Sequence, residues 1–126
     1  MDWTLRFLPE HRVLEVVTSG ELTIPDLVSM IAAASAEAVR RTTSRVLVDH
    51  RNVVMHLATM DIYDIPGHER AAGATPDLRV AFIVPSGDGG DFAFYENRSH
   101  NVGNIRRVFA ERDPALAWLS GATAAG

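Results

Sequence analysis

The chain has 126 residues, of which 47% are hydrophobic and 22% charged, the composition of one folded domain and not of a disordered or fibrous chain. Its formal net charge of −4 argues against a nucleic-acid partner, because phosphate contacts need clustered basic side chains. All basic side chains are arginine and cysteine is absent, which excludes chemistry that needs a lysine amine or a thiolate. No apolar run approaches the length of a membrane span, so we expect a cytoplasmic protein.

The first third of the sequence predicts two strands and a helix. Apolar and polar side chains alternate from Trp3 to Leu8, and an apolar segment runs from Val13 to Val17, a pattern typical of an antiparallel hairpin. Gly20 is expected to end the second strand. Thr23, followed by a proline and an acid, predicts a capped helix, and the three-and-four apolar spacing carries it from Ile24 to Arg40.

The middle of the chain predicts two buried strands with a helix between them. The β-branched run from Arg45 to Asp49 and the apolar run from Leu78 to Val84 each have the composition of a strand covered by helices. Between them, Thr59 is expected to cap a helix that Pro66 kinks or breaks. The glycine-rich segment 85–91 predicts a flexible loop.

The last third predicts a helix, a strand and a short helix. Asp91 is expected to cap a helix from Phe92 to Val102, which Gly103 ends in a left-handed conformation. A strand from Ile105 to Phe109 follows. An Asp-Pro pair then opens a helix from Ala115 to Leu119.

This order of elements predicts an α/β fold. Alternating strands and helices imply a mostly parallel sheet of about five strands with right-handed crossovers, an N-terminal antiparallel hairpin and about four helices. We expect one domain over residues 1–121. The small residues at 122–126 are expected to form a flexible C-terminal tail.

Short motifs spread along the chain carry a resemblance to a known family. They are the Val-Leu-Val-Asp strand at 46–49, the strand at 79–84, a helix from Phe-Tyr-Glu at 94–96 to Asn-Val-Gly at 101–103, Val-Phe at 108–109, and Ala-Leu-Ala-Trp-Leu at 115–119. With the strand and helix order, they make residues 3–120 resemble the SpoIIAA-like proteins, bacterial relatives of the STAS and SEC14 domains. The resemblance implies a β–α superhelix and frequent homodimerisation. It also implies either protein interaction, as in anti-sigma-factor antagonists, or binding of a lipid-like ligand, as in SEC14 domains.

The antagonists of that family carry a regulatory phosphoserine in an Asp-Ser-Ser-Gly motif at the start of the helix after the third strand. Counting from Asp49 without gaps places Leu57 to Met60 there, and only the hydroxyl of Thr59 corresponds in kind. The acid and the glycine are missing, which argues against a phosphorylation switch, although a phosphate at a helix N-terminus is physically favourable. The alternative is that Thr59 only caps the helix.

The other candidate site residues lie in two segments. Asp49, His50 and Arg51 lie at the C-terminal end of the predicted third strand, at the sheet edge where open α/β sheets place ligands. One alternative is a structural turn in which Asp49 accepts backbone hydrogen bonds, and another is an enzyme that uses Asp49 with His50 in a cleft. The resemblance adds Glu96 and Asn101, for which we expect structural hydrogen bonding.

No catalytic or metal-binding set stands out. Three histidines and two aspartates between residues 50 and 68 lack a metal-ligand spacing, and the adjacent Ser99 and His100 cannot act together as nucleophile and base. We therefore expect no enzymatic activity, no metal and no cofactor. The sequence favours a regulatory or protein-interaction module that forms a homodimer. The alternative, a carrier of a small apolar ligand, is motivated by the apolar segments 53–60 and 62–65 and needs a pocket of a few hundred cubic ångströms.

Overall fold

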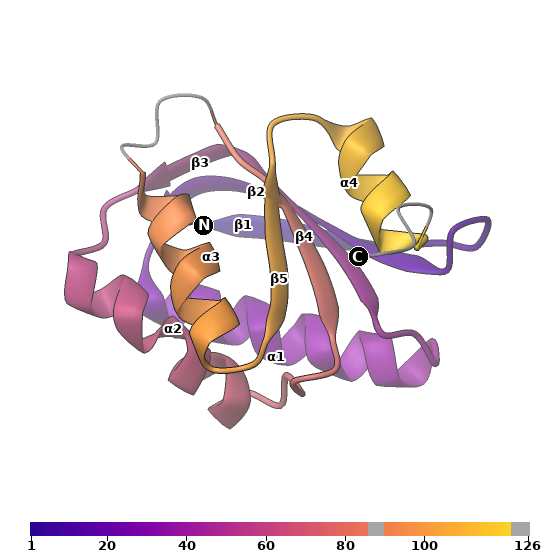
Figure 1. Ribbon diagram of the computed structural model, residues 1–126, viewed down its shortest axis with the longest axis horizontal. Coiled ribbons are helices and arrows are strands. Elements are labelled where there is room, and N and C mark those ends of the chain that lie inside the picture. Colours follow the sequence, from indigo (N-terminus) through magenta and orange to yellow (C-terminus); the bar gives the residue numbers. More distant parts are fainter. Residues whose placement is uncertain (86–89, 122–126) are drawn as a thin grey trace.

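In the computed structural model, which describes residues 1–85 and 90–121, five strands form one mixed sheet in sequence order (Figure 1). The strands are β1 (Asp2–Leu8), β2 (Val13–Leu22), β3 (Arg45–Met55), β4 (Arg79–Ile83) and β5 (Ile105–Phe109). The helices of the described residues are α1 (Ile24–Arg40), α2 (Thr59–Ala71), α3 (Asp91–Asn101) and α4 (Arg112–Leu119). β1 and β2 pair antiparallel and the other neighbours pair parallel, which confirms the predicted α/β fold. The predicted tail and most of the predicted flexible loop (86–89) lie outside the described residues.

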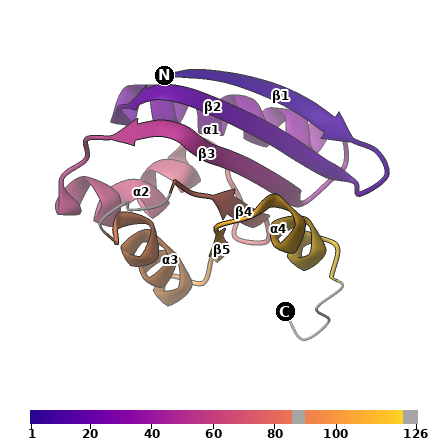
Figure 2. The same cartoon turned by 90° about the horizontal axis from the view of Figure 1, so that it is seen from above.

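Two hydrophobic clusters lie on opposite faces of the sheet. Alternate residues of β2, β3 and β4, such as Val48, pack against α1, α2 and α3 in the larger cluster. The intervening residues, such as Leu47, pack against α4 in the smaller one. Right-handed crossovers that always step to the next strand in the same direction put the first three helices on one face. Figure 2 shows α2 and α3 next to each other and α4 apart from them.

The start of α1 is confirmed, but the predicted end of the second strand is wrong. The hydroxyl of Thr23 accepts a hydrogen bond from the backbone amide of Asp26 at 3.3 Å and caps the helix. Gly20 lies inside β2, at a φ of +93°, and pairs with Val53 of β3. The strand therefore continues to Leu22, because a partner strand is present on that side.

The third strand is also longer than predicted. β3 pairs with β4 only as far as Asp49, which lies opposite Ile83, but it continues beside β2 to Met55. In this extension β3 pairs with β2 alone among the described strands, and one of its faces is exposed, so polar residues occur there. The apolar run from Arg45 to Asp49 therefore marks only the first part of the strand. The register shifts between Val17 and Ser19, so that Thr18 alone spans two residues of β3, the arrangement of a β-bulge.

The predicted caps of α2 and α3 are wrong by one residue. The N-cap of α2 is Ala58, whose backbone amide donates to the carboxylate of Asp61 at 3.0 Å. The N-cap of α3 is Gly90, and Asp91 is the first helical residue. In both helices the acid lies in the first turn, where the positive end of the helix dipole favours it.

Proline does not break α2, and glycine ends α3 as predicted. Helix α2 continues through Pro66, which removes one amide donor from its hydrogen-bond ladder. Gly103 has a φ of +84° and donates its amide to the carbonyl of His100 at 3.0 Å. Helix α4 begins at Arg112 and reaches the predicted end at Leu119. No described helix is long and apolar enough to cross a membrane.

Candidate functional site

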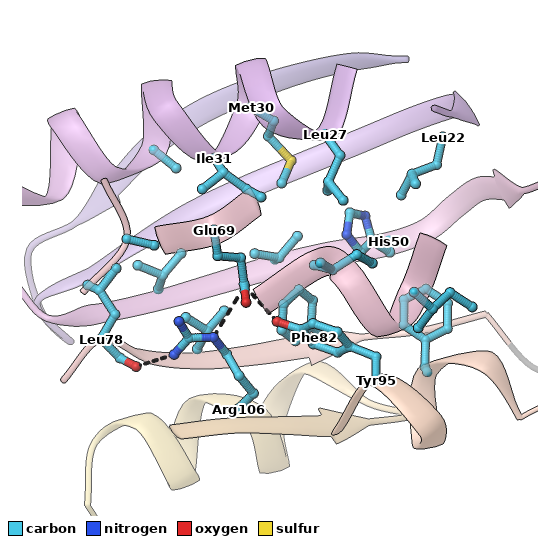
Figure 3. A pocket seen from close by; sticks show the side chains of 18 of the residues that line it. Leu22, Leu27, Met30, Ile31, His50, Glu69, Leu78, Phe82, Tyr95 and Arg106 are labelled. Atoms are coloured by element: carbon cyan, nitrogen blue, oxygen red, sulfur yellow. Dashed lines mark hydrogen bonds and ion pairs between the residues drawn. The ribbon is translucent and has the colours of Figure 1, made fainter. Parts of the chain in front are cut away.

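A cavity of about 70 Å³ lies between the sheet and the layer formed by α1, α2 and α3 (Figure 3). One water needs about 10–15 Å³ of such space, and an engineered apolar cavity of about 150 Å³ binds benzene. The cavity therefore has room for a molecule of a few non-hydrogen atoms. Most of its lining is aliphatic or aromatic and comes from Leu27, Met30, Ile31 and Ala34 of α1, Ile62 and Ile65 of α2, and Val46, Val48, Val80 and Phe82 of the sheet.

His50 is the polar side chain that β3 contributes to this lining, because alternate side chains of a strand point to the same face. Val46, Val48 and His50 are successive residues on the cavity side of the strand, and His50 is 2% exposed. In Figure 3 the imidazole lies beside Leu22 and Leu27, away from the end of the cavity formed by Arg106.

The imidazole of His50 is held between aromatic rings and one hydroxyl. It stacks on Phe82 with 5.8 Å between ring centroids and lies 5.9 Å from the ring of Phe92. Its Nδ1 is 2.7 Å from the hydroxyl oxygen of Thr18, the residue at the β-bulge. Burial lowers the pKa of His50 from 6.5 to about 4, against a smaller opposing effect of the Asp49 charge, so the ring is neutral at neutral pH.

The other end of the cavity is closed by a buried polar cluster, Glu69, Tyr95 and Arg106. The Tyr95 hydroxyl donates to Oε2 of Glu69 at 2.7 Å, and Nε of Arg106 lies 3.4 Å from the same oxygen. Arg106 also donates through Nη1 to the carbonyl of Leu78 at 2.5 Å. Burial and the Glu69 charge raise the pKa of Tyr95 well above its ordinary value. The cluster joins α2, α3 and β5 and keeps a charged pair compensated inside the fold.

The sequence-predicted group at Asp49, His50 and Arg51 is split between the two faces of the sheet. Arg51 donates to the Asp49 carboxylate at 3.0 and 2.8 Å on the face opposite the cavity. Burial alone would raise the pKa of Asp49, but the hydrogen bonds from Arg51 outweigh it and hold that pKa below its ordinary value. Asp49 and His50 therefore cannot work as a pair in one cleft. The prediction that the strand ends at Asp49 is also wrong, because His50 and Arg51 lie inside β3 as well.

The remaining candidates lie outside the cavity lining. Thr59 is exposed in the first turn of α2 and does not cap it. The Glu96 carboxylate accepts the backbone amide of Val108 at 2.6 Å and ties α3 to β5, the structural role expected for it. Asn101 is exposed at the last residue of α3.

Four residues around the cavity were not among the predicted site residues: Thr18, Glu69, Tyr95 and Arg106. Glu69 follows Ile62 and Ile65 at helical spacing, and this spacing predicts that it lies on the buried face of the helix. Adjacent arginines in a strand point to opposite faces, so one of the pair that includes Arg106 had to face the core. The sequence does not indicate that Glu69 and Arg106 pair with each other, because the two residues lie on different elements.

Within residues 1–85 and 90–121, no three histidine or acidic side chains are grouped as a metal site. No protein-family model, curated protein or solved structure matches the chain. The cavity, with its buried imidazole at one end and its charged cluster at the other, is therefore the feature from which we infer function.

Proposed function

We propose that the protein is a non-enzymatic regulatory module that binds a small, mostly apolar molecule in the cavity under α1, α2 and α3. The observation that carries this proposal is the composition of the cavity, an apolar wall with a few fixed polar groups at its ends. Small-molecule sites in proteins commonly have this composition. The proposal follows the ligand-binding side of the SEC14-like resemblance, but a volume of about 70 Å³ favours a ligand much smaller than a lipid.

The junction between β3 and α2 offers a route into the cavity. Met55 and Leu57 line the cavity and are half-buried, whereas most of the lining is buried. Methionine has three rotatable bonds, and it adapts to irregular spaces more readily than branched side chains do. Met55 pairs with Leu22 in the sheet, and Leu22 lies at the imidazole end of the cavity in Figure 3, so a ligand that enters here meets that end.

The test uses methyl propyl ether, a small apolar probe, with nuclear magnetic resonance of the methyl groups. Shifts at Leu27, Met30 and Ile31 are expected to saturate at millimolar ether. Ala34→Leu fills the cavity and should abolish them. Ala32→Leu is the matched control, because Ala32 is exposed on the same helix and the same atoms are added. Unchanged ether shifts in Ala34→Leu, or no shifts in the natural protein, would contradict the proposal.

Native mass spectrometry of the freshly purified protein tests the same proposal for a natural ligand. A retained molecule gives a reproducible excess mass that disappears on denaturation. The same excess should be absent from Ala34→Leu and present in Ala32→Leu. An excess mass that survives in Ala34→Leu would place the molecule elsewhere on the protein.

A protein-interaction role is the second candidate, favoured by the sheet face opposite the cavity. Helix α4 packs on β3, β4 and β5. On the part of that face formed by β2 and the β3 extension, Val17 is 38% and Val54 52% exposed. Such apolar side chains suit a second copy of the chain, and a stable dimer needs a buried interface above about 1,000 Å².

The oligomeric state tests this second candidate. A dimer at low micromolar concentration is expected from light scattering, and Val54→Glu should dissociate it. Val39→Glu is the control, since Val39 is 79% exposed on α1, away from this face. A monomer at all concentrations, or a dimer equally sensitive to both changes, would count against this interface.

A further inference from the structure

We propose that Nε2 of His50 accepts a hydrogen bond from the bound molecule and thereby selects a short aliphatic alcohol. This inference rests on the proposed function and adds the chemical class of the ligand. It depends on where the imidazole proton lies, and the hydrogen bonds around Thr18 decide that.

The hydroxyl of Thr18 fixes the proton on Nδ1. Thr18 donates its single hydroxyl hydrogen to the backbone carbonyl of Asp49 at 2.7 Å, and a carbonyl can only accept. The same oxygen lies 2.7 Å from Nδ1 of His50. Because the hydroxyl hydrogen is already used, Nδ1 must be the donor in that contact. A neutral imidazole carries one N–H, so Nε2 keeps its lone pair.

That lone pair belongs to a buried ring that has no second hydrogen-bond partner in the described part of the chain. Among residues 1–85 and 90–121, the hydrogen-bond partner of the His50 ring is the Thr18 hydroxyl, which contacts Nδ1 and not Nε2. His50 lines the cavity, and 2% of the residue is exposed, so the protein supplies little solvent contact to the ring. An unpaired buried acceptor favours a ligand that brings a donor.

A second acceptor lines the cavity, the carboxylate of Glu69. Its Oε2 accepts from Tyr95 and Arg106, whereas its Oε1 is buried without a hydrogen-bond partner among the described residues. In Figure 3 Glu69 and Arg106 lie toward the Leu78 end of the cavity, and His50 lies toward the Leu22 end. A short alcohol with its hydroxyl on His50 lays its carbon chain along the apolar wall between the two ends. An alcohol with its hydroxyl on Glu69 instead would bind His50→Leu and the natural protein with the same preference over an ether, which the experiment below distinguishes.

The experiment compares two isomers, 1-butanol and methyl propyl ether, which have the same atoms but differ in the O–H donor. Dissociation constants for the natural protein and His50→Leu are measured from methyl shifts. Leucine has a similar volume and no acceptor, and Thr18 keeps its bond to the Asp49 carbonyl. A buried hydroxyl without a partner is disfavoured, so His50→Leu should shift the butanol-to-ether affinity ratio toward ether by about fivefold or more.

The proton position is tested independently on the natural protein, which covers the case in which His50→Leu does not fold. Nitrogen-15 spectra should show Nδ1 protonated and Nε2 unprotonated at pH 7. The Nε2 resonance should move upfield with 1-butanol and stay in place with the ether. Thr18→Val, which removes the acceptor of Nδ1, should reduce the preference for the alcohol.

The outcomes separate this inference from the proposed function. If ether and butanol bind with the same affinity ratio in both proteins, the cavity binds small apolar molecules but His50 does not select them, and the inference fails alone. A protonated Nε2 would also overturn the inference alone. If a water molecule occupies Nε2 and butanol does not displace it, the resonance will not move, with the same consequence. Binding of neither probe would overturn the proposed function and the inference together.

Discussion

Acidification should destabilise the protein through His50. Above pH 6.5 the imidazole is neutral in both the folded and the unfolded chain, so its titration contributes nothing to the free energy of unfolding. Below pH 6.5 the unfolded chain takes up a proton, but the folded chain does not until the pH nears about 4. The unfolded state therefore binds more protons in this window, and stability falls as the pH falls.

The expected size follows from the separation of the two pKa values. Each pKa unit corresponds to about 1.4 kcal/mol, so a shift from 6.5 to about 4 gives a loss of about 3 kcal/mol between neutral pH and pH 4. This loss is large beside the 5–15 kcal/mol that typically separates folded from unfolded domains.

Urea unfolding followed by tryptophan fluorescence, at several pH values between 7.5 and 4.5, measures the effect. His50→Leu is the reference, because it removes this titration and leaves the other acidic and histidine groups in place. The difference in unfolding free energy between natural protein and variant should change by about 1.4 kcal/mol per pH unit below 6.5. A difference that stays constant over this range, or an imidazole that titrates near 6.5 in the folded protein, would show that burial does not lower the pKa of His50.

Three further outcomes are expected. Tyr95→Phe removes the donor to Glu69 and should lower the unfolding free energy by about 1–3 kcal/mol; equal stability would mean that Glu69 finds another donor. Gly103→Ala should lower the unfolding free energy by about 1 kcal/mol, because Gly103 has a φ of +84°, whereas Gly67→Ala inside α2 should raise it by a similar amount. Effects of the same sign at both positions would contradict this explanation from backbone conformation. Asp49→Asn should lower stability at pH 7, and the difference from the natural protein should vanish as the pH falls below 3.8, measured by urea unfolding.

Local patterns in the sequence account for most of the fold. The capped start of α1 at Thr23 and the left-handed end of α3 at Gly103 depend on neighbouring residues, and both were predicted correctly. The extension of β3 was missed because it depends on β2, a partner elsewhere in the chain. For the same reason no local pattern marks the β-bulge at Thr18, although this bulge orients His50.

The candidate site was predicted only in part. His50 was selected, but its neighbours Asp49 and Arg51 were grouped with it, although successive residues of a strand point to opposite faces. The grouping assumed that the strand had already ended. The cavity volume depends on how α1 and α2 pack over the sheet, which no single segment encodes.

The ion pair between Glu69 and Arg106 has a consequence for the order in which the protein can fold during synthesis. The two residues lie 37 positions apart, in α2 and in the last strand, β5. When α2 has left the ribosome, the carboxylate that belongs inside the fold still lacks its guanidinium, and burying it alone is unfavourable. The nascent chain therefore gains little from closing α2 over the sheet until β5 emerges, and the end of the cavity nearest Leu78 is the part completed last.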